Sequence, residues 1–99
     1  MLIRIVRMTF KKEETDNFLK VFNYSKQQIR AFPGCRHLEL HQDYNKDHIY
    51  VTYSIWDNED ALNAYRQSEL FESVWAKTKA LFADKPVAFS HKQVLTVNG

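Results

Sequence analysis

The chain has 99 residues, of which 44% are hydrophobic and 14% aromatic, and its formal charge at pH 7 is +2. A chain of this length forms about one domain, and so much hydrophobic sequence excludes a disordered protein. Acidic and basic side chains are intermixed, so we expect no nucleic-acid partner and no membrane surface as a partner. The lone Cys35, the arginines that interrupt the apolar N-terminal residues and the absence of a long apolar run together predict a cytoplasmic location.

The first half of the chain predicts a strand, a helix and a hairpin. Residues 2–10 are rich in β-branched and apolar side chains and predict the strand. A helical stripe follows, with spacings of three and four, at Phe18, Phe22, Ser25, Ile29 and Phe32. Pro33-Gly34 ends this helix, because proline breaks the hydrogen-bond ladder and glycine accepts a left-handed turn. Segments 35–44 and 48–57 alternate around a short polar turn and predict a β-hairpin.

The second half predicts two short helices and a last strand. Asp57 is the expected N-cap of the first helix, with Asp60 three residues later. Ser68 is the expected cap of the next helix, which carries an apolar stripe at Phe71, Trp75, Thr78 and Phe82. Residues 87–97 read as the last strand.

This order of elements predicts an α+β fold of ferredoxin-like β-α-β-β-α-α-β plan, with a four-stranded antiparallel sheet and helices on one face. Both faces of the sheet carry apolar side chains: Ile3 and Ile5 point one way along the first strand, and Val6 and Met8 point the other. Because the helices cover only one face, we expect a homodimer that pairs the other sheet face with a second copy.

Four stretches of the sequence resemble the antibiotic biosynthesis monooxygenase (ABM) domain family. They are Pro33-Gly34-Cys35, Tyr53-Ser54-Ile55-Trp56, Ala61-Leu62 and Tyr65 to Phe71. The resemblance covers nearly the whole chain, 1–99, as a single domain, and it implies a dimeric α+β barrel. Characterised relatives include cofactor-free oxygenases of phenolic polyketides, quinol monooxygenases and haem-degrading monooxygenases. The resemblance therefore implies a small-molecule monooxygenase without a cofactor, acting on a phenolic or quinol-like aromatic substrate.

Individual positions separate these branches. Where the haem-degrading members carry an axial His, a haem-contacting Trp and a first-strand Asn, this chain has Trp75, Tyr65 and Val6. The iron ligand is missing, so we expect no haem. The resemblance to the cofactor-free oxygenases implies that the protein uses no other cofactor. Trp56 matches the pocket Trp of the polyketide-oxidising members, whereas Thr52 replaces their oxyanion-binding Asn.

Cofactor-free oxygenation needs a base, donors aimed at an oxyanion and an aromatic cavity. The catalytic candidates are His37, Thr52 and Tyr65, and Arg36 and Ser54 are further polar candidates. The predicted substrate pocket consists of Val6, Met8, Ser54, Trp56, Tyr65, Phe71 and Trp75.

Two other interpretations of the aromatic residues stay open. The domain could be a non-catalytic dimer that binds a small aromatic or hydrophobic ligand. The aromatics could also fill the pocket themselves, as the core of a structural or sensing protein.

The run His37, Glu39, His41 invites a metal site, but two strand residues four positions apart lie about 13 Å apart. One metal with His–metal bonds of roughly 2.1 Å does not span that distance, so we expect no metal. Cys35 is expected to be a small, partly buried structural residue.

Overall fold

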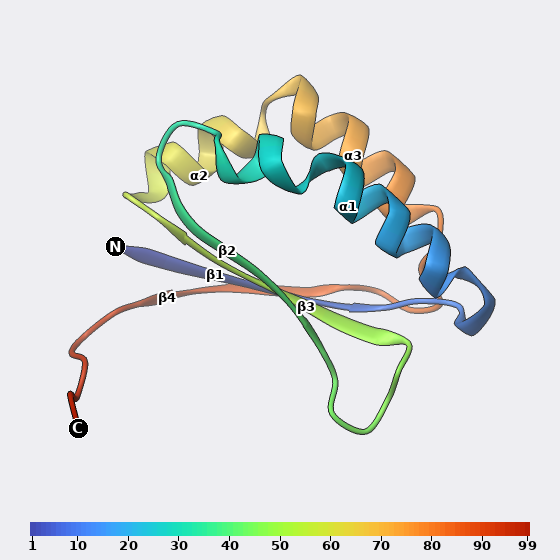
Figure 1. The fold of residues 1–99 in the computed structure, drawn as a ribbon. Helices are drawn as coiled ribbons and strands as arrows, with labels where there is room; N and C mark the ends of the chain where they lie inside the picture. Colours follow the sequence, from blue (N-terminus) through green and yellow to red (C-terminus); the bar gives the residue numbers. More distant parts are fainter.

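Two layers make up the molecule: a twisted four-stranded sheet, and helices that all lie on one of its faces (Figure 1). The computed structural model describes residues 1–99. Its elements, in chain order, are β1 (Leu2–Thr9), a short 3-10 turn (Lys12–Glu14), α1 (Thr15–Arg30), β2 (Cys35–Gln42), β3 (Ile49–Trp56), α2 (Glu59–Arg66), α3 (Glu69–Lys79) and β4 (Val87–Lys92). The predicted ferredoxin-like α+β fold is confirmed. None of the helices is long and apolar enough to cross a membrane.

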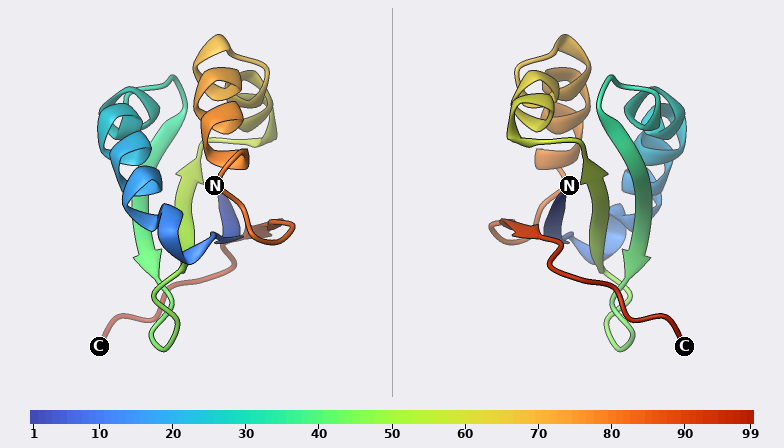
Figure 2. Two further views of the ribbon diagram at one scale, coloured as in Figure 1. Left: turned by 90° about the vertical axis from the view of Figure 1, so that its right-hand side faces the viewer. Right: turned by 90° about the vertical axis from the view of Figure 1, so that its left-hand side faces the viewer.

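The strands run antiparallel in the order β2-β3-β1-β4. Met8 pairs with Tyr50 and Leu2 with Trp56 across β1 and β3, and these even-numbered residues face the helices. The odd-numbered residues of the same strands, such as Ile5, face away from them, because side chains alternate along a strand. End-on views show that the helices leave this second face uncovered (Figure 2).

The helix starts show one error in the sequence prediction. Ser68 caps α3 as expected, accepting a hydrogen bond of 3.1 Å from the backbone N–H of Phe71. Asp57, however, does not cap α2. The cap is Asn58, whose side-chain oxygen accepts from the N–H of Ala61 at 2.9 Å, while the Asp57 carboxylate receives two hydrogen bonds from Arg36. Because Arg36 is charged, its hydrogen bonds to the Asp57 carboxylate are strong, and the carboxylate is not available to the N–H groups at the start of α2.

The last strand is shorter than the predicted 87–97. It ends at Lys92, which pairs with Leu2, the first residue of β1. Beyond that point the neighbouring strand offers no further backbone groups, so residues 93–99 have no ladder to join within this chain.

Two buried clusters hold the helices on the sheet. Near the hairpin end of the sheet, Met8, Phe10, Phe18 and Tyr50 pack together, with the rings of Phe10 and Phe18 stacked 4.1 Å apart. At the opposite end, Trp56 is buried with Cys35 and Leu62. Between these two clusters the helices do not pack directly on the sheet.

Candidate functional site

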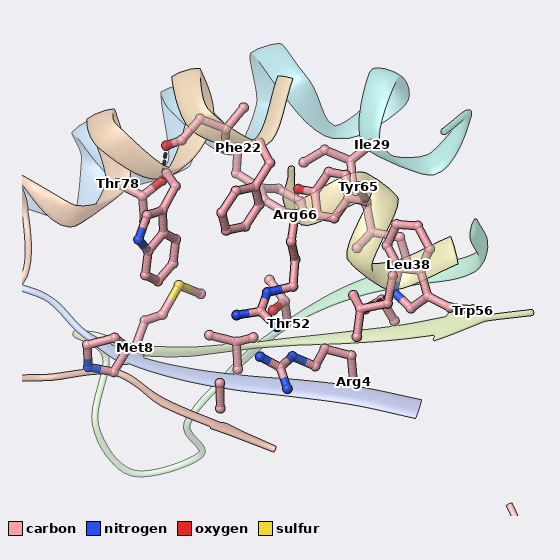
Figure 3. Close-up of a pocket in the computed structure, with 18 of the residues that line it drawn as sticks. Arg4, Met8, Phe22, Ile29, Leu38, Thr52, Trp56, Tyr65, Arg66 and Thr78 are labelled. Atoms are coloured by element: carbon pink, nitrogen blue, oxygen red, sulfur yellow. Dashed lines mark hydrogen bonds between the residues drawn. The ribbon is translucent and has the colours of Figure 1, made fainter. Parts of the chain in front are cut away.

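A cavity of about 310 Å³ lies between the helix-facing side of the sheet and the three helices (Figure 3). Thirteen of its 19 lining residues are hydrophobic. All seven residues of the predicted substrate pocket line it: Val6, Met8, Ser54, Trp56, Tyr65, Phe71 and Trp75. That they contact a substrate stays a prediction. Arg66 and Ala88 are the exposed members of the lining, which places the opening between α2 and β4.

Four aromatic rings form one side of this cavity in a continuous series. Tyr65 stacks on Trp56 at a ring distance of 5.0 Å and meets the edge of Phe71 at 5.3 Å. Phe71 in turn stacks on Trp75 at 5.8 Å, since residues four apart share a face of α3. The series presents flat aromatic surfaces to anything held beside it.

The polar groups of the cavity are few, and two of the hydroxyls are already engaged. Ser54 Oγ accepts a hydrogen bond of 3.0 Å from Trp56 Nε1, and Thr78 donates to the carbonyl of Val74 at 2.8 Å. Thr52, a catalytic candidate, also lines the cavity. The charged side chains in the lining are two arginines, Arg4 and Arg66; it contains no carboxylate and no imidazole.

Tyr65, the second catalytic candidate, lines the cavity with its ring largely buried. Burial, with a smaller effect from nearby Cys35, raises the pKa of its hydroxyl to about 12. The hydroxyl therefore stays protonated at neutral pH, where it can donate a hydrogen bond to an oxyanion but cannot serve as a base.

His37, the third candidate, does not lie in the cavity, which corrects its predicted placement. The register of β2 shifts between Cys35 and His37, so that Cys35 pairs with Trp56 and His37 with Ile55. Such a bulge reverses which face each later side chain occupies. Leu38 consequently lines the cavity, and His37 lies on the opposite face of the sheet.

The other polar candidates of β2 are also engaged elsewhere. Arg36 forms a two-pronged ion pair with Asp57, at 2.6 and 3.0 Å, outside the cavity. Glu39 bonds both His37 and His41, the latter with 2.7 Å between His41 Nε2 and Glu39 Oε1. These hydrogen bonds, first from His41 and then from His37, lower the pKa of the Glu39 carboxyl.

Cys35 is buried against Trp56 and Leu62, and burial raises the pKa of its thiol. A protonated thiol in this position packs as a small apolar side chain.

Among the lining residues that the sequence analysis did not predict, the two charged ones are Arg4 and Arg66. The sequence does indicate Arg4, because alternation along β1 places it with Leu2 and Val6 on the helix-facing side, where a charged residue is unexpected. Arg66 carries no such signal, since a basic residue in the last turn of a helix is ordinary.

Fold and cavity together define the class of protein: a ferredoxin-like α+β domain with an aromatic cavity of ligand size between sheet and helices. The family model of the antibiotic biosynthesis monooxygenases (ABM) matches residues 1–77, and the chain belongs to this family.

Solved structures repeat the fold at low sequence identity. The structure of an antibiotic biosynthesis monooxygenase is 21% identical, with a TM-score of 0.90 over 96% of this chain and 100% of its own. A protein from Nitrosomonas europaea, provisionally named for the same function, is 15% identical, with a TM-score of 0.89 and the same coverages. A conserved protein from Methanosarcina mazei Go1 is 16% identical, with a TM-score of 0.88 over 94% of this chain and 93% of its own. A comparison with functionally curated proteins finds no significant match.

Proposed function

We propose that this protein is a cofactor-independent monooxygenase that oxidises a small phenolic or quinol-like aromatic substrate. The observation that carries the proposal is the cavity walled by the stacked series of Trp56, Tyr65, Phe71 and Trp75. A planar ring fits beside such a wall, and its contacts with the faces and edges of these rings add to the burial of its surface. Membership of the monooxygenase family supports this assignment.

In the proposed reaction the substrate supplies the electrons. A quinol and molecular oxygen give a hydroxyquinone and water: one oxygen atom enters the ring, and the other leaves with two hydrogens. The hydroxyl of the substrate loses its proton first, to water at the opening, because the lining contains no carboxylate or imidazole that could accept it, and its two arginines are already protonated. The protonated Tyr65 hydroxyl and the Thr52 hydroxyl are available as donors to the oxyanion, and the apolar wall excludes bulk water.

The activity test is oxygen uptake by metal-free and flavin-free protein with a panel of quinols and phenols, with product mass measured in parallel. Ala88 is exposed at the opening, so Ala88→Trp should close the cavity without unfolding the domain and lower the rate about tenfold or more. Ala76→Trp adds the same ring to an exposed position of α3 outside the lining and should leave the rate unchanged. Oxygen uptake that is equal in both variants would contradict a reaction in this cavity.

A non-catalytic ligand-binding domain is the second candidate function. The observation that favours it is the absence from the lining of a side chain that could act as a general base. Quenching of tryptophan fluorescence by an aromatic ligand, without oxygen uptake from any member of the panel, would establish this alternative. A cavity of about 310 Å³ favours ligand binding over the third interpretation, a pocket filled by its own side chains.

We also propose that the protein is a homodimer formed through the uncovered sheet face. This face carries a row of apolar side chains: Ile3, Ile5, Val51, Tyr53, Ile55 and Phe89. Phe89 is 42% exposed, and its pairing with Ile5 places it on the sheet face that points away from the helices. Exposed apolar patches of several hundred Å² mark interaction surfaces, and a two-fold copy covers one with an equal patch.

The dimer predicts a strong effect of Ile5→Glu. Ile5 pairs with Tyr53 on one side and Phe89 on the other, at the middle of the apolar row. A carboxylate there would be buried without a partner in the dimer but stay hydrated in a monomer, so the variant should sediment as a folded monomer at micromolar concentration. Gln27→Glu adds the same charge on the exposed side of α1 and should remain dimeric. A wild-type monomer at this concentration would rule out the proposed assembly.

A further inference from the structure

The two arginines of the cavity point to the kind of substrate it takes. We propose that the cavity selects aromatic ligands that carry an anionic oxygen group, a carboxylate or a phenolate, held between the guanidinium groups of Arg4 and Arg66. This inference rests on the proposed function, because it names the substrate class of the same cavity.

The two side chains come from opposite walls. Arg4 projects from the inner strand β1 toward the helices, and Arg66 is the last residue of α2. In the close-up their guanidinium groups lie near one another across the cavity, with Thr52 beside them (Figure 3). Arg4 is half-buried in the floor and Arg66 is exposed at the opening, so a ligand entering from solvent passes between the two charges.

Neither arginine has an acidic partner. No carboxylate lies within ion-pair distance of Arg4 or Arg66, whereas Arg7 and Arg36 of the same sheet are paired with Asp43 and Asp57. The bond that Arg4 makes is with a neutral group, Ser90 Oγ, at 3.1 Å. Each guanidinium has five N–H donors, so most of the donors on both side chains remain available to a ligand.

Electrostatics favours an anion between these groups. Burial, and secondarily the charge of Arg66, lowers the pKa of Arg4, which means that the site disfavours its positive charge. Two like charges that face one apolar cavity repel each other and are poorly hydrated on that side. An oxyanion relieves both effects, and its carboxylate form matches the planar fork of arginine with two parallel hydrogen bonds. A cationic ligand is rejected for the same reason.

The remaining wall defines the rest of the ligand. Thirteen of the 19 lining residues are hydrophobic, and the four rings of the aromatic series are among them. At about 310 Å³ the cavity is at the small end of ligand pockets, which run from roughly 300 to 1,000 Å³. A molecule of about one or two fused rings with one anionic group fits this combination of size and polarity. A polyanion such as a nucleotide does not, because the charged part of the lining is confined to two side chains.

The same pair would assist the proposed reaction. A quinol or phenol must ionise before it reacts with oxygen, and two guanidinium groups next to its hydroxyl stabilise the anion relative to the neutral form. The cavity can then promote ionisation of the substrate without a side chain that accepts the proton.

Ligand binding to the full chain, measured by tryptophan fluorescence, tests the inference with three ligands of one shape: 2-naphthoate, neutral 2-naphthamide and cationic 2-naphthylmethylammonium. The wild type should bind the carboxylate about tenfold or more tightly than the amide, and the cation more weakly still. Methionine keeps the apolar stem of arginine but not its charge. Arg66→Met and Arg4→Met should therefore each abolish the preference for the carboxylate while leaving amide binding unchanged. Lys77→Met removes an equal charge from an exposed position outside the lining and should retain the preference.

Equal affinity for carboxylate and amide in the wild type, or no binding of either, would overturn the inference. So would an equal loss of both ligands in Arg66→Met, which is exposed and should fold even if Arg4→Met does not. Oxygen uptake from a panel of quinols separates this result from the proposed function. Oxygen uptake without a preference for the carboxylate ligand would support the oxygenase but contradict the anion site. A preference for the carboxylate without oxygen uptake would support the anion site in a protein that binds a ligand without oxidising it.

Discussion

Replacement of Trp56 by alanine should lower the free energy of unfolding by about 3–5 kcal/mol. Trp56 is the largest fully buried side chain, with 1% of its surface exposed. Its ring stacks on Tyr65 at 5.0 Å, meets Phe32 edge-on at 6.4 Å, and donates a hydrogen bond from Nε1 to Ser54. Alanine would leave a hole beside the existing cavity and an unpaired buried hydroxyl. The total stability of a domain this small is about 5–15 kcal/mol, so the loss would be a large fraction of it.

Urea denaturation followed by circular dichroism measures this loss. Trp56→Phe retains most of the packing but not the N–H donor, so it should lose less than Trp56→Ala and isolate the contribution of the hydrogen bond to Ser54. Tyr24→Ala removes another aromatic ring at a position that is 83% exposed, and should change stability by no more than about 0.5 kcal/mol. Similar unfolding midpoints for the Trp56 and Tyr24 alanine variants would contradict the buried position of Trp56.

The sequence was sufficient to predict the elements because each is set by local periodicity. Phe18, Ser25 and Ile29 repeat at helical spacing, and all three are buried on α1. The details that failed depend on partners distant in sequence. Asp57 lost its capping role to Asn58 because Arg36, 21 residues earlier, binds its carboxylate. The last strand stops at Lys92 because its neighbour begins at Leu2.

The site shows the same division. The aromatic wall follows from alternation in β3 and from the four-residue spacing of Phe71 and Trp75 on α3, both of which are visible in the sequence. The position of His37 cannot be predicted from these patterns, because one bulge after Cys35 moves every later side chain of β2 to the other face of the sheet. The position of this bulge depends on how β2 pairs with β3, and no pattern within residues 35–42 indicates it.

Gly34→Ala should also destabilise the protein strongly, by about 2–5 kcal/mol. Gly34 has a φ of 88°, in the left-handed region where a side chain costs about 1–2 kcal/mol. A Cβ at this position would collide with the Cβ of Ala61 on α2. The carbonyl of Gly34 also accepts a hydrogen bond of 2.9 Å from the N–H of Asp57, so the turn cannot move freely away from the helix.

A double-mutant cycle separates the two causes. Ala61→Gly alone should cost about 0.5–1 kcal/mol through lower helix propensity. In the double variant, Gly34→Ala with Ala61→Gly, the clash is gone and the cost of the left-handed backbone remains, so the loss should be smaller than the sum of the two single losses. Strictly additive losses would show that Gly34 and Ala61 are not in contact. The contact sets how closely α2 approaches the sheet, and α2 carries both Tyr65 and Arg66 into the cavity. Gly34→Ala should therefore weaken 2-naphthoate binding in the fraction that remains folded, and Ala61→Gly in the same chain should restore it.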